Sequence, residues 1–120
     1  MRIGLMHGAR REPFTLGEAV ELAVRAESDG FDSVWCGDSV LARPRLEALG
    51  TPSAVAGRTK RVKLGTAGFL PALRNPVILA KQIATLDFLS QGRFFPAVGL
   101  GQEEPEEYEA CGVSKEGRVT

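Results

Sequence analysis

Four short apolar runs recur along the chain, and each is typical of a β-strand. They are RIGLM at residues 2–6, FDSVWC at 31–36, VKLGTAGF at 62–69 and RFFPAVGL at 93–100. Their starts lie 29, 31 and 31 residues apart. Because the segments between them carry helical signals, the repeating unit is one strand followed by one helix.

Each intervening segment opens with residues that favour the start of a helix. Thr15 and Glu18 form the T-x-x-E pattern of a capping box. Later starts combine a capping side chain or a glutamate with a following proline, and they are Thr51-Pro52, Asn75-Pro76 and Glu104-Pro105. The expected helix ends lie at Gly30, Gly92 and Gly112. We also expect Gly57 to lie inside the second helix.

Alternating strands and helices with continuously apolar strands predict an α/β fold with a parallel sheet. Two architectures fit, namely an open doubly wound sheet and a TIM-type (β/α)8 barrel. A barrel of about 250 residues has about 31 residues per unit, which is the spacing seen here. We therefore expect one partial domain over residues 1–120, with four βα units and the sheet order 1-2-3-4 of a half barrel.

The charge balance excludes one broad class of partner. The chain of 120 residues carries 15 Lys and Arg against 15 Asp and Glu, so it lacks the basic character of a nucleic-acid-binding protein. No apolar stretch reaches the roughly 18–20 residues of a membrane span. Cys36 and Cys111 make no disulfide framework and have no histidine at zinc-site spacing. We expect a cytoplasmic protein without a metal.

In parallel α/β folds, functional groups gather at the carboxyl ends of the strands. Those ends hold His7-Gly8, Gly37-Asp38-Ser39, residues 66–69 and Gly99-Leu100-Gly101. His7 is the only histidine, and it suits either proton transfer or a hydrogen-bonded loop position. Gly99-Leu100-Gly101 does not continue as a dinucleotide fingerprint, because Glu104 occupies the third glycine position.

Glutamates are concentrated near the carboxyl end of the chain. The acidic run comprises Glu103, Glu104, Glu106, Glu107 and Glu109. Carboxylates favour the positive end of a helix dipole, so we expect this run to be the solvated start of a helix. The alternative is that Glu103 or Glu104 reaches the site as an acid.

Residues 30–101 resemble the luciferase-like monooxygenase family of flavin- or deazaflavin-dependent (β/α)8 oxidoreductases. The matching runs, in order, are GFDSVWCGDS, GRTKRVKLGTAGFLPALRNPVILAKQIATLDFLSQGRF and AVGLG. The resemblance implies monooxygenation or hydride transfer with reduced FMN or an 8-hydroxy-5-deazaflavin on a small organic substrate. It also implies that the cofactor ring lies over the barrel mouth.

The resemblance further implies which residues meet the cofactor. A non-prolyl cis peptide is expected at Ala67–Gly68, and Asp38, Ser39, Thr66, Ala67 and Gly68 are the expected cofactor contacts. Asp38 is, with His7, a catalytic candidate. The alternative for Asp38 is a local structural role. The alternative for residues 66–68 is that they are merely small residues at the end of a strand. Many relatives have histidine where this chain has Ser39, and serine transfers protons poorly at neutral pH without a partner base.

The same resemblance implies that a complete site needs more than these four units. In TIM barrels the phosphate is usually held by loops after strands 7 and 8. We therefore expect an N-terminal half, from a truncated reading frame or a short paralogue, that is inactive alone and can form a homodimer. The alternatives are a self-contained flavodoxin- or Rossmann-type binding domain without redox chemistry, and a non-catalytic assembly piece.

Overall fold

A computed structural model describes residues 1–7, 16–43, 45–101, 106–114 and 116, with only the backbone of His7 and Leu16. The elements alternate between strand and helix as the sequence predicts. They are β1 (Gly4–His7), α1 (Leu16–Ser28), β2 (Ser33–Cys36), α2 (Gly50–Ala56), β3 (Lys63–Phe69), the 3-10 turn η1 (Pro71–Leu73), α3 (Pro76–Ser90), β4 (Phe94–Val98) and α4 (Glu106–Ala110).

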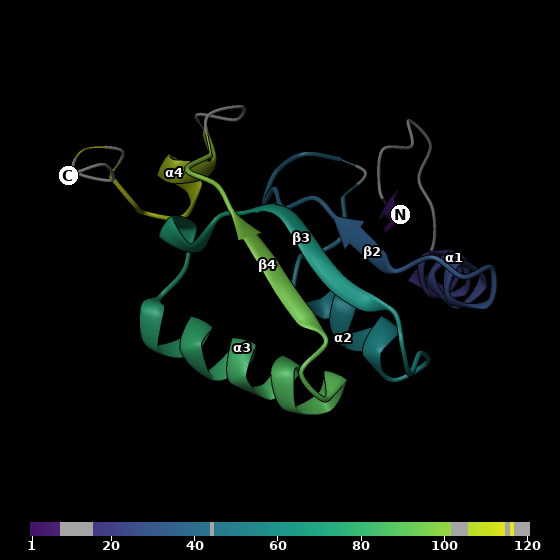
Figure 1. Ribbon diagram of the computed structural model, residues 1–120. Helices are drawn as coiled ribbons and strands as arrows, with labels where there is room; N and C mark the ends of the chain where they lie inside the picture. Colours follow the sequence, from purple (N-terminus) through teal and green to yellow (C-terminus); the bar gives the residue numbers. More distant parts are fainter. Residues whose placement is uncertain (8–15, 44, 102–105, 115, 117–120) are drawn as a thin grey trace.

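The four strands form one parallel sheet in the order β1-β2-β3-β4, which confirms the predicted topology. A doubly wound sheet needs a switch point where the order reverses, and these strands have none. Figure 1 shows α1, α2 and α3 following one another along the sheet, with α4 near the ends of the strand arrows. The sheet is not closed, so the described strands form an arc of a barrel rather than a complete one.

Strand register explains which side chains form the core. Leu5, Val34, Leu64 and Phe94 are register partners in successive strands, so they form one row across the sheet. The last three of these are buried among residues of the helices, and Leu5 packs against them. Because side chains alternate between faces, the neighbouring row of Met6, Trp35, Gly65 and Phe95 faces the side without helices.

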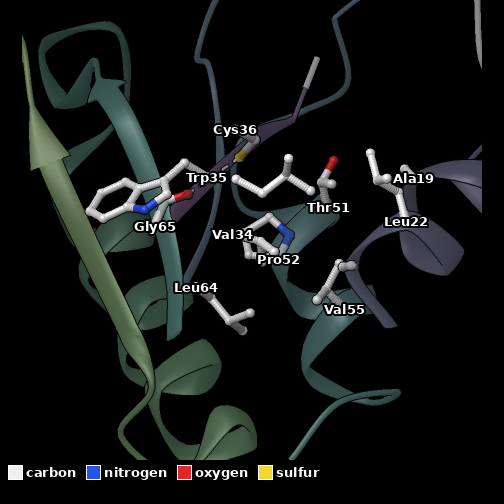
Figure 2. A pocket seen from close by; sticks show the side chains of 12 residues that line it. Ala19, Leu22, Val34, Trp35, Cys36, Thr51, Pro52, Val55, Leu64 and Gly65 are labelled. Atoms are coloured by element: carbon white, nitrogen blue, oxygen red, sulfur yellow. Dashed lines mark hydrogen bonds between the residues drawn. The ribbon is translucent and has the colours of Figure 1, made fainter. Parts of the chain in front are cut away.

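Between α1, α2 and the sheet lies a small apolar cavity of about 20 Å3 (Figure 2). The Cys36 side chain lies beside Thr51 and Val34 in this layer. Its thiol lies 3.8 Å from the Gly65 carbonyl oxygen and 3.9 Å from that of Ala48, at the limit of a sulfur hydrogen bond. Burial, with the nearby carboxylates of Asp38 and Glu47, raises the pKa of the Cys36 thiol to about 12. The thiolate that reacts with oxidants is therefore scarce at this position.

Capping residues set most of the helix ends. Gly30 has a φ of 87° and follows α1 in a Schellman arrangement, with the Phe31 N–H donating to Ala26 O at 2.9 Å. The Asn75 side chain accepts hydrogen bonds from the N–H groups of Val77 and Ile78, as an N-cap does. Both predictions are confirmed, whereas Thr15 and the Glu104-Pro105 start lie outside the described residues.

The predicted start of α2 is wrong. Thr51 lies within the helix, and Leu49 is the N-cap residue, without a side-chain cap. Instead the Glu47 carboxylate accepts hydrogen bonds from the N–H groups of Leu49 and Gly50, at 2.8 and 2.6 Å. Gly57, expected inside the helix, is its C-cap residue.

Two long charged side chains close the amino-terminal end of the sheet. Glu27 accepts hydrogen bonds from the three consecutive N–H groups of residues 60–62, and these bonds lower the pKa of its carboxyl although burial alone would raise it. Arg93 donates to the carbonyls of Ala56, Thr59 and Val62 at 3.0–3.1 Å. These hydrogen bonds satisfy backbone N–H and carbonyl groups that the hydrogen bonds within the helices and the sheet leave without a partner.

The edge strand β4 contains a proline whose missing N–H is not needed by β3. Leu64 N–H donates to Arg93 O at 2.8 Å, so residue 93 faces β3. In a parallel strand alternate residues bond to the same neighbour, so Phe95 and Ala97 face β3 while Pro96 faces the free edge. Pro96 therefore fits the edge position that proline tolerates.

Trp35 on the helix-free face depends on a glycine beside it. A Cβ atom added to Gly65 would lie 2.1 Å from Cε3 and 2.4 Å from Cζ3 of the Trp35 indole. On the other flank, a Cβ on Gly4 would lie 2.9 Å from the indole nitrogen, which donates to Ser33 Oγ at 2.8 Å. The Trp35 indole thus lies over the backbone of β1 at Gly4 and of β3 at Gly65, where these strands have no side chain.

We expect Gly65→Ala to displace the Trp35 indole and to lower the free energy of unfolding by about 1–3 kcal/mol, as overpacking does. Trp35 is the only tryptophan, so its fluorescence should shift to the red as the ring becomes hydrated. Denaturant titration followed by fluorescence measures both effects.

Gly57→Ala is the matched control. Its new Cβ would lie 3.6 Å from the nearest atom, Ala54 O, and its φ of −70° suits alanine. This variant should keep the emission spectrum of the wild type, and its free energy of unfolding should rise by about 0.4–1 kcal/mol. Equal emission spectra and equal midpoints for the two variants would contradict the packing described for Trp35.

Candidate functional site

The carboxyl ends of the strands surround a cavity of about 580 Å3, which we call the mouth cavity. Its walls come from all four strand ends and from α4. The lining residues are Met6, Asp38, Ser39, Arg45, Ala67, Gly68, Leu70, Gly99, Gly101 and Glu107. In the described part of the chain, no group of three or more His, Cys, Asp or Glu side chains could hold a metal ion.

Four of the five expected cofactor contacts meet in this cavity, namely Asp38, Ser39, Ala67 and Gly68. Thr66 does not line it. Its side chain is wholly buried, and its hydroxyl has no hydrogen-bond partner among the residues that the structure describes. His7 ends β1, but its side chain is outside the described residues, as are Glu103 and Glu104.

Bare backbone forms the floor of the mouth cavity. The Ala67–Gly68 peptide bond is cis, as the sequence analysis expects, and the register with β4 shifts between Ala67 and Phe69. A Cβ on Gly68 would lie 3.4 Å from the Gly99 Cα, so the ends of β3 and β4 approach closely. The floor therefore offers a surface free of large side chains to any flat molecule above it.

Asp38 anchors the backbone that follows this floor. Its side chain is 2% exposed, and Oδ2 accepts hydrogen bonds from Leu70 N–H at 2.8 Å and Arg74 Nη1 at 2.7 Å. Oδ1 accepts from Arg74 Nη2 at 2.9 Å, which makes the pair bidentate. Both carboxylate oxygens are therefore already engaged by donors of the chain itself.

Arg74 extends this anchor to the start of α2. Its Nη2 also contacts Glu47 Oε1 at 3.1 Å, and its guanidinium carbon lies 4.6 Å from the centre of the Phe69 ring. Burial alone would lower the pKa of Arg74, but the two carboxylates raise it above its ordinary value. Arg74 was not among the residues predicted for the site, although its place after the third strand and before the Asn75 cap is a usable signal.

Glu107 anchors the loop that follows β2, and this corrects the expectation of a solvated acidic run. The residue is 3% exposed, and its Oε1 accepts hydrogen bonds from the Ser39 hydroxyl and from Leu41 N–H, the latter at 2.8 Å. Burial alone would raise the pKa of Glu107, but these bonds lower it below its ordinary value. Glu106 and Glu109 are exposed, as expected.

The Ser39 hydroxyl is fully engaged. It donates to Glu107 and accepts a hydrogen bond from Ala42 N–H at 3.0 Å. Tyr108 is buried next to Glu107 and donates to Leu100 O, so α4 also holds the end of β4. The walls of the mouth cavity are thus fixed by side chains from several elements.

Comparison with known proteins places this architecture. The sequence profile described as luciferase-like monooxygenase matches residues 1–120. The chain belongs to the luciferase-like monooxygenase family. Among curated relatives, it is similar to an F420-dependent glucose-6-phosphate dehydrogenase from Amycolatopsis mediterranei, with 45% identity over 101 residues covering 78% of this chain and 30% of that protein.

Solved structures of luciferase-like enzymes share the fold. The oxygenating constituent of 3,6-diketocamphane monooxygenase from Pseudomonas putida, in complex with FMN, superposes with a TM-score of 0.84 and 25% identity, covering 93% of this chain and 32% of that one. An F420-dependent secondary alcohol dehydrogenase with an F420-acetone adduct gives a TM-score of 0.68 and 34% identity, covering 85% and 33%. The chain thus spans about a third of the length of these relatives.

We expect Thr66→Val to raise the free energy of unfolding by up to about 1 kcal/mol. The variant removes a buried hydroxyl that no described residue satisfies, and it keeps the side-chain shape. Thr59→Val is the matched control, because the Thr59 hydroxyl donates to Val55 O at 2.8 Å and accepts from Arg93 Nη1 at 2.9 Å. Thr59→Val should lower the free energy of unfolding by about 1–3 kcal/mol. Chemical denaturation measures both, and a destabilised Thr66→Val would reveal a partner for that hydroxyl.

We expect Glu107→Gln to destabilise the fold at neutral pH by about 1–3 kcal/mol, because a buried charged acceptor is lost. A carboxyl whose pKa is lowered by folding stabilises the fold fully at pH values above its ordinary pKa of 4.5. This contribution disappears as the pH falls through the folded-state pKa. The gap between wild type and variant should therefore be constant near pH 7 and should narrow below about pH 4.5.

The exposed Glu109→Gln serves as the control for that experiment, and it should stay within about 0.5 kcal/mol of wild type at every pH. Thermal unfolding across the pH series provides the measurement. A gap between wild type and Glu107→Gln that widens in acid would contradict the role given to Glu107.

Proposed function

We propose that this chain supplies the ring-binding part of the site of a luciferase-like oxidoreductase that uses a reduced deazaflavin or flavin. The observation that carries the proposal is the floor of the mouth cavity, where the cis Ala67–Gly68 bond meets Gly99 without a large side chain between them. A planar ring system needs such a flat surface for close contact. The reduced cofactor would supply a hydride, or would activate oxygen, at this surface.

We propose an 8-hydroxy-5-deazaflavin as the first candidate cofactor and FMN as the second. Relatives named as F420-dependent share 45% and 38% identity with this chain over more than 100 residues. A structural neighbour in complex with FMN shares 25% identity. The greater sequence similarity therefore supports the deazaflavin, and the substrate would be a small organic molecule.

Within this site we assign different tasks to the two catalytic candidates. Both oxygens of Asp38 are engaged by Arg74 and Leu70, which supports a positioning role beneath the floor rather than proton transfer. His7 stays the proposed proton-transfer group, since it ends β1 beside Cys36 in the register and an imidazole titrates near neutral pH. Ser39 has both its donor and an acceptor position occupied, which supports a structural role.

We further propose that these four strands are not sufficient for turnover. The loops that usually hold a cofactor phosphate in TIM barrels follow strands 7 and 8, and the described sheet has four strands. Oriented binding is what hydride transfer requires, so a ring surface alone gives little rate. A second copy could complete the sheet as a homodimer.

We propose a cytoplasmic location for the chain, because its two free cysteines suit a reducing setting.

Titration with FMN, and separately with the deazaflavin F420, tests this proposal by fluorescence after size separation. The monomer of residues 1–120 should show no saturation below roughly 100 μM ligand, since the four described strands do not include the loops that usually hold the phosphate. Low-micromolar binding by the monomer would contradict the proposed insufficiency. Binding by a dimer alone would indicate a barrel completed by two copies.

A pair of variants locates any binding that is measured. Gly68→Val fills the floor of the mouth cavity and should abolish binding, whereas Gly57→Val lies far from the cavity and should not alter it. Equal binding by both variants would exclude the floor as the cofactor surface.

A further inference from the structure

The charged side chains that line the mouth cavity differ in how fully they are engaged. Among the described residues, those lining the cavity with a charge are Asp38, Arg45 and Glu107. Asp38 is held by Arg74 and a backbone N–H, and Glu107 is held by two neutral donors. The Arg45 side chain, by contrast, forms neither an ion pair nor a hydrogen bond with any of the described residues.

The guanidinium of Arg45 lies beside Gly37, the residue that follows β2. A Cβ on Gly37 would lie 3.3 Å from Arg45 Nη1, 3.4 Å from Cζ and 3.7 Å from Nε. The backbone of the loop that carries Arg45 is anchored, because Arg45 N–H donates to Ala42 O and Ala42 N–H donates to the Ser39 hydroxyl. A planar group with five N–H donors is suited to a bidentate oxyanion.

Glu107 is one carboxylate that could compete for this charge. The positive charge of Arg45 contributes to the lowered pKa of Glu107, but the two side chains form no ion pair. The accepting Oε1 of Glu107 is directed to Ser39 and Leu41 instead. The donors of Arg45 therefore remain available to a molecule in the cavity.

We propose that Arg45 binds the oxyanion of the substrate, a phosphate monoester or a carboxylate, at the rim of the mouth cavity. The assignment to the substrate rests on the proposed function, in which the floor receives the cofactor ring and the cofactor phosphate belongs to loops after strands 7 and 8. Arg45 is then a specificity-determining residue that favours anionic substrates over neutral ones.

Arginine-detected proton–nitrogen spectra of the chain, titrated with inorganic phosphate and with acetate at constant ionic strength, test the oxyanion site without any cofactor. The Nε–H signal of Arg45 should shift and saturate at millimolar concentration. Arg58, which is exposed and paired with Glu21 at 2.9 Å, is the internal control and should show no saturation. Identical titration of the two arginines would overturn the proposal.

Variants at the site sharpen this result. Arg45→Gln should abolish saturable phosphate binding, and Arg58→Gln should leave it unchanged. Gly37→Ala places a methyl group 3.3 Å from Arg45 Nη1, a tight contact that the guanidinium relieves by shifting, so it should weaken binding by about threefold to tenfold while Arg45 is retained. Circular dichroism confirms that each variant is folded, and unaltered phosphate binding by Arg45→Gln would overturn the proposal.

FMN and riboflavin, which differ only in a phosphate, separate the two possible sources of the oxyanion. FMN should bind at Arg45 no more tightly than inorganic phosphate does. Binding of FMN that is at least about tenfold tighter than both phosphate and riboflavin, and that is lost in Arg45→Gln, would assign the oxyanion to the cofactor and overturn the substrate assignment. Phosphate binding at Arg45 without saturable binding of flavin or F420 by the monomer would support the oxyanion site, and it agrees with the expectation that these four strands alone hold the cofactor weakly. Phosphate binding at Arg45 that Gly68→Val leaves unchanged would separate the oxyanion site from the cofactor surface.

Discussion

The ion pair between Asp38 and Arg74 joins the three segments that shape the mouth cavity. It connects the end of β2, the backbone after the cis Ala67–Gly68 bond and, through Glu47, the start of α2. A buried ion pair is favourable only when further hydrogen bonds compensate for lost hydration. Leu70 supplies such bonds from both its N–H and its carbonyl group. The position of the cavity floor therefore depends on this one pair of side chains.

The two ends of the sheet use charge in opposite ways. At the amino-terminal end, Glu27 and Arg93 direct nearly all their hydrogen-bonding groups to loop backbone, which closes that end. At the carboxyl end, Asp38 and Glu107 serve the walls of the cavity while Arg45 keeps its donors. This division agrees with the separation of stability and chemistry that parallel α/β folds show. It also explains how a chain of zero net charge can present a local positive group.

Much of this architecture follows from features that are local in sequence. The strand spacing predicts the order of the sheet, and Gly30 and Asn75 cap their helices through neighbouring residues. The cis bond was implied by family resemblance rather than by composition. Contacts between distant segments were not predictable, as the hydrogen bond between Glu107 and Ser39 shows, which spans 68 positions. The cap of α2 is local, but the Thr51-Pro52 signal pointed away from Glu47, whose side chain accepts from Gly50 N–H three residues on. A carboxylate in an acidic run gives no sign, in sequence alone, of which loop it will meet.

The orientation of Pro96 limits what can lie beside β4. Its ring faces the free edge, so a strand that joins there finds carbonyl groups on β4 but lacks one donor at the level of Thr66. An arbitrary extended peptide would leave a carbonyl of its own without a partner at that level, which is costly once water is excluded. A strand with a bulge at that level, or one whose carbonyl reaches another donor, would not incur the cost. The edge thus discriminates among neighbours by register, and it discourages indiscriminate strand addition without being closed.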